Sequence, residues 1–261
     1  MFKEYFQGIW RDRFILSSLV NTDLQKKYRR SKLGVAWAIL TPLGLSLIMG
    51  SVYAILFAVD AREFIPLLFA GLNPWQFISA AADGGTVAFL GAEGYLKQTT
   101  VNAQIFPLRT VIVSFINLLY SILAFFALYL FLRPLVFSAK MLLCIPGLVL
   151  LFLFALGLAN FSSIINLDIR DFQPFQTLLL QGVFYATPIV YQADMLKEKG
   201  FELLYRLNPF YYLIEVVRMP MQGIGVPSWD VWLIAAVIAF SVFFTSVWFL
   251  MRRRDKVVFK L

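Results

Sequence analysis

The sequence predicts an all-α integral membrane protein, and three observations support this fold class. Of the 261 residues, 60% are hydrophobic and only 15% are charged, and the mean hydropathy is +0.76. A water-soluble domain of this size cannot bury so much apolar surface. Long apolar runs recur along the chain, and a helix needs about 20 such residues to cross a bilayer. Basic residues gather before the first run and after the last.

Six membrane-spanning helices are expected from the apolar runs. They cover residues 34–59, 64–90, 106–132, 141–167, 173–191 and 231–251. The second run is interrupted by Asn73, Pro74 and Asp83, whereas the sixth ends abruptly at Arg252. The expected organisation is a cytoplasmic amphipathic segment at 1–33, a transmembrane domain at 34–251 and a basic cytoplasmic tail at 252–261.

The distribution of positive charge predicts the orientation in the membrane. Eight Lys and Arg residues precede the first expected span and five follow the sixth. Cytoplasmic segments carry such an excess, so a multi-pass protein with both termini in the cytoplasm is expected. The N-terminus lacks an apolar segment followed by a small-residue cleavage site, and no secretory signal peptide is expected. The basic residues are explained by membrane topology, and no nucleic-acid partner is expected.

Several kinds of chemistry have no residues to support them. The chain has no histidine, a single cysteine (Cys144) and no G-x-x-x-x-G-K-[ST] stretch. His-ligated metal sites, an internal disulfide and a phosphate-binding loop are therefore excluded. No catalytic, cofactor or metal site is expected here, and any ATP-driven work needs an ATPase on another polypeptide.

Two segments do not fit a plain series of spans. Residues 5–30 alternate apolar and charged side chains, which is typical of a helix lying in the membrane interface. The stretch "NPFYYLIEVVRMPMQG" begins with a good helix start at Asn208 and reaches a stop at Gly223. It is too short to span, so it lies on the outer surface or, as we favour, re-enters the protein. Its polar face carries the candidate gate residues Tyr211, Glu215 and Arg218.

Polar side chains recur at four-residue spacing along the fifth expected span: Gln173, Thr177, Gln181 and Tyr185. This stripe must face protein or water, because lipid cannot satisfy it. It serves either as hydrogen-bonding contact between helices or as the lining of a hydrated channel. Asn160, Ser162, Ser163 and Asn166 allow the same alternatives, and helix–helix contact is preferred for them. Amides together with 27 Phe, 11 Tyr and 6 Trp form the kind of surface that suits sugars.

Three segments resemble the membrane subunit of type-2 ABC exporters, in the branch that exports O-antigen, capsule and teichoic acid polysaccharides. They are "YRRSKLGVAWAILTPL", "IRDFQPFQTLLLQGVFYATPIVY" and "LNPFYYLIEVVR", which follow one another in the family's order within residues 10–255. Each segment alone is a moderate signal, and their order makes the resemblance strong.

The resemblance implies a homodimer with a channel between the protomers, bound to two copies of an ATP-binding subunit that holds ATP and magnesium. It implies an interface helix at 5–30, periplasmic gate helices at 195–225, and a coupling helix at about 93–103. Tyr95, Lys97 and Gln98 are then candidate contacts to the ATPase, although the loop 91–105 is otherwise compatible with a solvated turn. The implied location is the inner membrane of a Gram-negative bacterium, and the implied cargo is a lipid-linked polysaccharide.

The basic cluster before the first span has two expected roles. Each Lys or Arg attracts anionic lipid by about 1 kcal/mol, which anchors the helix. Arg29 and Arg30 are also candidate contacts to the diphosphate of a lipid-linked glycan, because guanidinium groups bind phosphate oxygens in a bidentate way.

Two alternatives stay open from the sequence. The same fold exports drugs or small lipids in other family members. A membrane-embedded transferase acting on a polyprenyl phosphate is the less favoured alternative, since it needs acidic residues to hold Mg²⁺. Asp168 and Asp171 are the nearest such pair, and an ion-pair set with Arg170 is expected for them instead.

Overall fold

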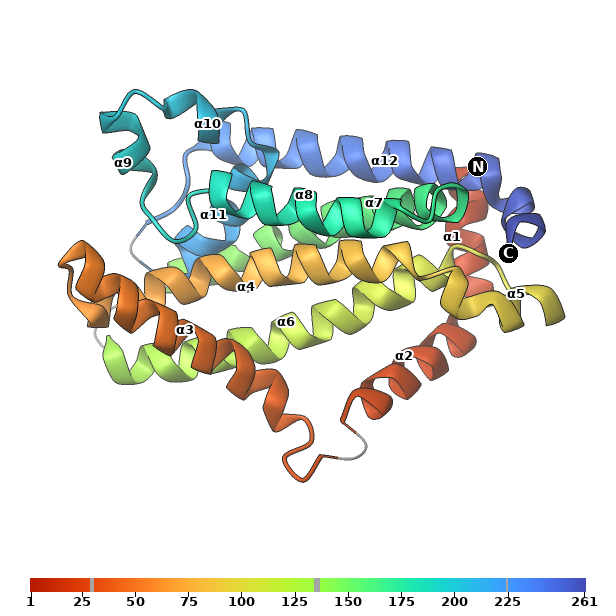
Figure 1. Ribbon diagram of the computed structural model, residues 1–261, viewed down its shortest axis with the longest axis horizontal. Helices are drawn as coiled ribbons and strands as arrows, with labels where there is room; N and C mark the ends of the chain where they lie inside the picture. Colours follow the sequence, from red (N-terminus) through yellow and green to blue (C-terminus); the bar gives the residue numbers. More distant parts are fainter. Residues whose placement is uncertain (29–30, 134–136, 224) are drawn as a thin grey trace.

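The computed structural model describes residues 1–28, 31–133, 137–223 and 225–261, and every regular element in these ranges is a helix (Figure 1). The α-helices are α1 (Phe2–Arg11), α2 (Arg13–Tyr28), α3 (Ala36–Phe57), α4 (Ala61–Thr86), α5 (Glu93–Gln98), α6 (Ile105–Leu132), α7 (Cys144–Asp168), α8 (Phe172–Ala186), α9 (Ala193–Glu198), α10 (Glu202–Arg206), α11 (Pro209–Met221) and α12 (Trp229–Lys260). Two short 3₁₀ helices, η1 (Leu90–Ala92) and η3 (Ala139–Leu143), precede α5 and α7.

Five segments among the described residues are long and apolar enough to cross a membrane: Ala36–Phe57, Ala61–Thr86, Ile105–Leu132, Ala139–Asp168 and Trp229–Arg254. The sequence predicted six, and the difference lies in the fifth expected span, 173–191. There α8 has 15 residues, and at a rise of 1.5 Å per residue it is about 22 Å long, less than the thickness of a hydrocarbon core. The chain leaves the helix at Thr187 and continues in turns.

The centre of the bundle is built by close contact between α4, α7 and α12. A Cβ atom added to Gly85 of α4 would lie 2.6 Å from the Cα atom of Ala159 in α7. On another side of α7, a Cβ atom on Gly157 would lie 2.7 Å from Cγ1 of Val242 in α12. Small residues at such crossings let two helix backbones approach closely, which is the common way to join helices in lipid.

The bundle has two distinct ends (Figure 1). Both termini, α1 and α5 lie at one end, whereas α9 and α10 lie at the other. Because consecutive spans alternate in direction, the α3–α4 link, the C-terminal end of α6 and the N-terminal end of α7 also lie at the end that carries α9 and α10. The arrangement agrees with the expectation that both termini share one side of the membrane.

The N-terminal interface segment forms two helices where the sequence predicted one, because the chain turns at Asp12 between α1 and α2. Phe6, Trp10 and Phe14 are exposed to 55%, 70% and 73%, as expected for rings that enter lipid. The guanidinium carbon of Arg13 lies 4.6 Å from the Trp10 ring centroid and 4.3 Å from that of Phe14, within range of a cation–π interaction. At the other terminus, α12 continues through the predicted basic tail as far as Lys260.

Candidate functional site

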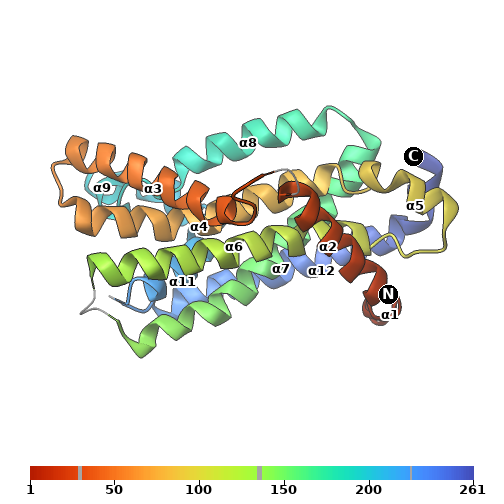
Figure 2. The same cartoon turned by 90° about the horizontal axis from the view of Figure 1, so that it is seen from below.

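A groove of about 580 Å³ runs between α3, α4 and α8. Figure 2 shows α3 and α8 on the outside of the bundle, on the same side as α4. Thr177, Gln181 and Tyr185 of the predicted stripe line this groove, together with Asp83 of α4. Gln173, the fourth stripe residue, lies with Thr177 and Gln181 along a shallower hollow on α8. All four predicted residues therefore face one continuous surface.

One member of the stripe makes a contact between helices, and the other members are exposed. The hydroxyl of Thr177 donates a hydrogen bond to Oδ1 of Asp83 at 3.2 Å, so this residue joins α8 to α4. Tyr185 is 71% exposed, and Gln173 and Gln181 are exposed as well. The stripe is thus joined to α4 at Thr177, and its role as a channel lining stays a prediction.

A second set of polar contacts fixes the start of α8. The backbone N–H of Gln173 donates to Oδ1 of Asn166 at 3.1 Å, while Nδ2 of Asn166 donates to the carbonyl oxygen of Thr86 at 2.8 Å. Gln176 is buried and accepts a hydrogen bond from the hydroxyl of Ser162. Asn166 and Ser162 therefore act as contacts between helices, which is the role the sequence favoured for them.

Sequence analysis missed the contribution of α4 to the groove. Gln76, Ser79 and Asp83 line it beside the α8 stripe. They follow one another at spacings of three and four residues, which places them on one helix face. The helical spacing that predicted the α8 stripe also predicts a common face for Gln76, Ser79 and Asp83. The sequence interpretation considered Asp83 only as an interruption of the second expected span.

The predicted amphipathic helix that begins at Asn208 is present as α11. The side chain of Asn208 accepts a hydrogen bond from the N–H of Phe210 at 3.0 Å and so caps the helix where the sequence predicted its start. Glu215 and Arg218 are 5% and 7% exposed and form an ion pair with each other. Arg218 also donates to the carbonyl oxygen of Pro188 at 2.7 Å. The polar face of α11 is thus buried in protein and fastens α11 to the chain just after α8.

The third predicted gate residue has different surroundings. Tyr211 is half-buried, and its ring centroid lies 5.0 Å from that of Tyr205 in α10 in an edge-to-face arrangement. Of the three candidates, Tyr211 is therefore the one that borders the short outer helices, whereas Glu215 and Arg218 hold α11 in place.

The candidate ATPase contacts project from the end of the bundle that carries both termini (Figure 1). Tyr95 is 47% exposed, and Lys97 and Gln98 are exposed beside it, while Leu96 is buried and holds α5 to the bundle. Lys97 lies 2.7 Å from Glu93, and this ammonium lowers the pKa of the Glu93 carboxyl below its usual range. Helix α5 thus exposes the Tyr95 ring and the charged side chains of Lys97 and Glu93, while the buried Leu96 side chain holds the helix against the bundle.

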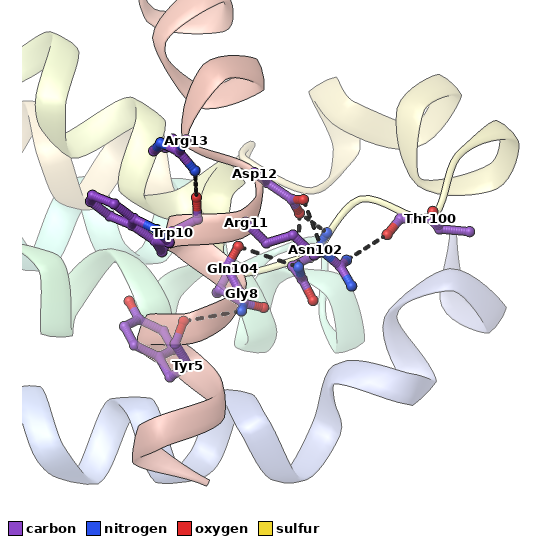
Figure 3. A network of polar contacts seen from close by, with 9 residues as sticks. All are labelled: Tyr5, Gly8, Trp10, Arg11, Asp12, Arg13, Thr100, Asn102 and Gln104. Carbon is purple, nitrogen blue, oxygen red and sulfur yellow. Dashed lines mark hydrogen bonds and ion pairs between the residues drawn. The ribbon is translucent and has the colours of Figure 1, made fainter.

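The loop that follows α5 is bound to the turn between α1 and α2, as Figure 3 shows. The Asp12 carboxylate, 6% exposed, accepts from the backbone N–H and from Nδ2 of Asn102, both at 2.8 Å. Arg11 donates to the carbonyl oxygen of Thr100 at 3.0 Å. A Cβ atom on Gly8 would collide with the side-chain amide of Gln104, so a larger residue here would displace that side chain. Sequence reasoning did not find this junction, because it joins residues about 90 positions apart.

Two further predictions concern charged residues. Arg29 and Arg30, the candidate phosphate contacts, lie outside the described residues. Asp168 pairs with Arg253 at 2.6 Å and with Lys260, both on α12, and not with Arg170 as the sequence predicted. The reason is that α12 extends past the membrane span and brings its basic residues alongside the end of α7.

These features define a class: a helical membrane protein with a polar groove on one side and a short exposed helix, α5, at the end that carries its termini. Residues 15–222 match the family described as ABC-2 type transporter. This match covers most of the chain, and the protein belongs to that family.

Similar proteins include the O-antigen export system permease protein RfbA of Klebsiella pneumoniae, which is 28% identical over 201 residues and covers 77% of each chain. The protein of the same name from Myxococcus xanthus is 30% identical over 221 residues and covers 79% of each chain. The chain is therefore a transporter permease subunit rather than an enzyme, and its relatives place it in the polysaccharide-export branch.

Proposed function

We propose that this protein is the channel-forming subunit of an ATP-driven exporter that moves a lipid-linked polysaccharide across the bacterial inner membrane. O-antigen is the cargo that the similar proteins favour, with capsule and teichoic acid as the alternatives within this branch. Two copies of the chain would form the channel, and two copies of a separate ATP-binding subunit would drive it. Both termini would lie in the cytoplasm with α5 seated in the ATPase.

The observation that carries the proposal is the polar groove between α3, α4 and α8. It is bordered by the candidate membrane spans α3 and α4 and by the shorter α8. At membrane depth, exposed polar groups are costly unless they meet water or protein. Thr177, Gln181 and Tyr185 offer it hydroxyl and amide groups, and Trp75 and Phe184 offer it aromatic rings. A polysaccharide has hydroxyl groups at the edges of its rings and CH groups on their faces, so both kinds of side chain suit it.

The mechanism assigned to the chain is transport without covalent chemistry. The ATPase would push on Tyr95 and its neighbours, and the force would pass through the Asp12–Asn102 junction to the interface helices. An ion pair also joins Arg109 of α6 to Asp23 of α2, with Nε and Oδ2 2.5 Å apart. The interface helices are thus tied both to the loop after α5 and to a membrane-spanning helix.

The first test is deletion of the gene, followed by gel electrophoresis of surface polysaccharide and of fractionated cytoplasmic material. Loss of polymer from the surface, with accumulation inside on its lipid carrier, is the expected result. A normal surface profile would contradict polysaccharide export and would move a drug or small-lipid exporter to first place.

Complementation then tests the groove itself. Gln181→Trp fills the groove and should fail to restore surface polymer at normal protein levels. Leu179→Trp introduces the same residue on the same helix, at a position that is 53% exposed and does not line the groove. This control should restore surface polymer. Equal export by both variants would show that cargo does not pass this surface.

A further inference from the structure

A second polar cavity, of about 360 Å³, lies between α3, α4 and α6, and nothing in the proposed transport path uses it. Its volume falls in the range of small-molecule sites, about 300–1,000 Å³. It is lined by hydroxyl and amide side chains from all three helices: Thr41, Asn73, Gln76, Ser114, Asn117 and Ser121. Trp37 and Phe77 add aromatic rings.

One lining residue, Asn73, carries a buried polar atom that the described residues leave unsatisfied. Asn73 is 2% exposed, and its Oδ1 accepts a hydrogen bond from the hydroxyl of Ser121 at 2.5 Å. Its Nδ2 has no hydrogen-bond partner among the described residues. Exchanging the two amide atoms does not cure this, because Oδ1 would then be the unpaired atom. A buried polar atom without a partner costs about 1–3 kcal/mol, so a group that bonds to it gains affinity.

The charge of the lining indicates what kind of ligand fits. None of the residues that line the cavity is ionisable, so a phosphate or carboxylate would be buried without a counter-charge, which is costly. A neutral ring with several hydroxyl groups fits better: its oxygens accept from Asn73 and donate to the amide and hydroxyl oxygens, and its CH face packs on Trp37 or Phe77.

The position of the cavity relates it to the groove. Gln76 of α4 lines both of them, so the two polar hollows share one side chain. Figure 1 shows α3 and α6 at the outside of the bundle on this side.

We infer that this cavity binds one neutral sugar ring of the lipid-linked cargo, as a recognition site beside the transport path. The inference rests on the proposed function and names a part of the substrate that the chain reads. In this inference Asn73 binds the glycan, and the cavity does not bind the lipid carrier.

The test measures binding rather than export. The full chain is reconstituted in nanodiscs of phosphatidylethanolamine and phosphatidylglycerol. Two radiolabelled probes are compared: the lipid-linked glycan purified from the deletion strain, and undecaprenyl diphosphate without sugar. The variant Asn73→Leu with Ser121→Ala removes both partners of the buried hydrogen bond, which keeps the shape and leaves no new unpaired group.

This variant should bind the glycan-linked probe about tenfold more weakly, as expected from the loss of one well-made buried hydrogen bond, and bind the bare carrier as before. The matched control is Asn160→Leu with Ser246→Ala, the same chemical change at a buried pair between α7 and α12, 3.3 Å apart. It should leave both affinities unchanged. Thr41→Val, an isosteric change on α3, is a second variant and should weaken glycan binding by about threefold.

Unchanged glycan affinity in both cavity variants would overturn the inference and indicate a cavity that holds only water, while the proposed function would stand. An equal loss for both probes would also overturn it, because the cavity would then read the carrier. Failure of the proposed function is separate: the deletion strain would then accumulate no lipid-linked glycan.

Discussion

The junction between Asp12 and the loop after α5 gives a prediction whose size follows from the contacts. Asp12→Ala removes two hydrogen bonds of 2.8 Å to Asn102 from a carboxylate that is 6% exposed. Hydrogen bonds to charged groups contribute about 1.5–3 kcal/mol each. Because the loop regains some water in the variant, the expected loss in the free energy of unfolding is about 2–4 kcal/mol.

The chain carries its own reporter for this loss. Cys144 is the single cysteine and is 6% exposed, so a thiol-reactive dye labels it as the bundle opens. For a protein of this length the expected fall in unfolding temperature is about 5–10 °C. Asp194→Ala, which removes an exposed carboxylate from α9 at the opposite end, is the control and should shift the temperature very little.

A double-mutant cycle shows whether the contact itself is responsible. Asn102→Ala and Asp12→Ala together should cost at least about 1 kcal/mol less than the sum of the two single changes. Strict additivity, within about 0.3–0.5 kcal/mol, would refute the idea that the two side chains act as a unit. With the ATPase bound, the same variants should hydrolyse ATP while exporting less, since the proposed force passes through this junction.

Three further predictions follow from single features. Burial alone would raise the pKa of Asp12, but hydrogen bonds from Asn102 and Arg11 outweigh burial, and the pKa is lowered. The stability that Asp12 adds is therefore complete above the usual Asp pKa of about 3.9 and is lost as the pH falls through the native pKa. Unfolding curves of the wild type should approach those of Asp12→Asn in strong acid and differ most near pH 6. Arg218→Leu leaves Glu215 buried without its partner and should lower the free energy of unfolding by about 3–5 kcal/mol. Adding Glu215→Gln to this variant should recover most of that loss, as measured by thermal unfolding. Equal stability of the single and double variants would contradict the buried pair. Gly85→Ala brings a Cβ atom to 2.6 Å from the backbone of α7 and should lower the free energy of unfolding by about 1–3 kcal/mol. The control is Gly44→Ala, whose new Cβ atom has no atom within 4 Å. It should leave the unfolding temperature unchanged or raise it.

Sequence patterns predicted what depends on local periodicity and composition. The all-helical membrane fold, the start of α11 at Asn208 and the common face of the α8 stripe follow from hydropathy, capping chemistry and four-residue spacing. The length of α8 did not follow, because the apolar run continues to Val190 while the helix ends at Ala186. Hydropathy does not distinguish a helix from turns buried in protein, and Ile189 and Val190 are 1% and 9% exposed.

Contacts between distant parts of the chain were beyond the reach of such patterns. Asn102 lies in a loop, where no periodicity marks a partner, and its bond to Asp12 depends on how α1 packs against the bundle. Asp168 finds Arg253 and Lys260 because α12 runs on as a helix beyond the membrane span. The sequence suggested the nearer Arg170, and the tertiary arrangement supplied a different partner.

The helices of the bundle are held together in two ways, and the difference bears on which of them can move. α4, α7 and α12 meet through backbone contact at Gly85 and Gly157, and this packing is lost at once if the helices separate. In α8 the buried residues are Gln176 and Leu180, and its attachment depends on hydrogen bonds such as that from Thr177 to Asp83. Water in a hydrated groove can replace such bonds at small cost. In the proposed channel, a wall that opens for a polymer and closes behind it is therefore better built from α8 than from the core of the bundle.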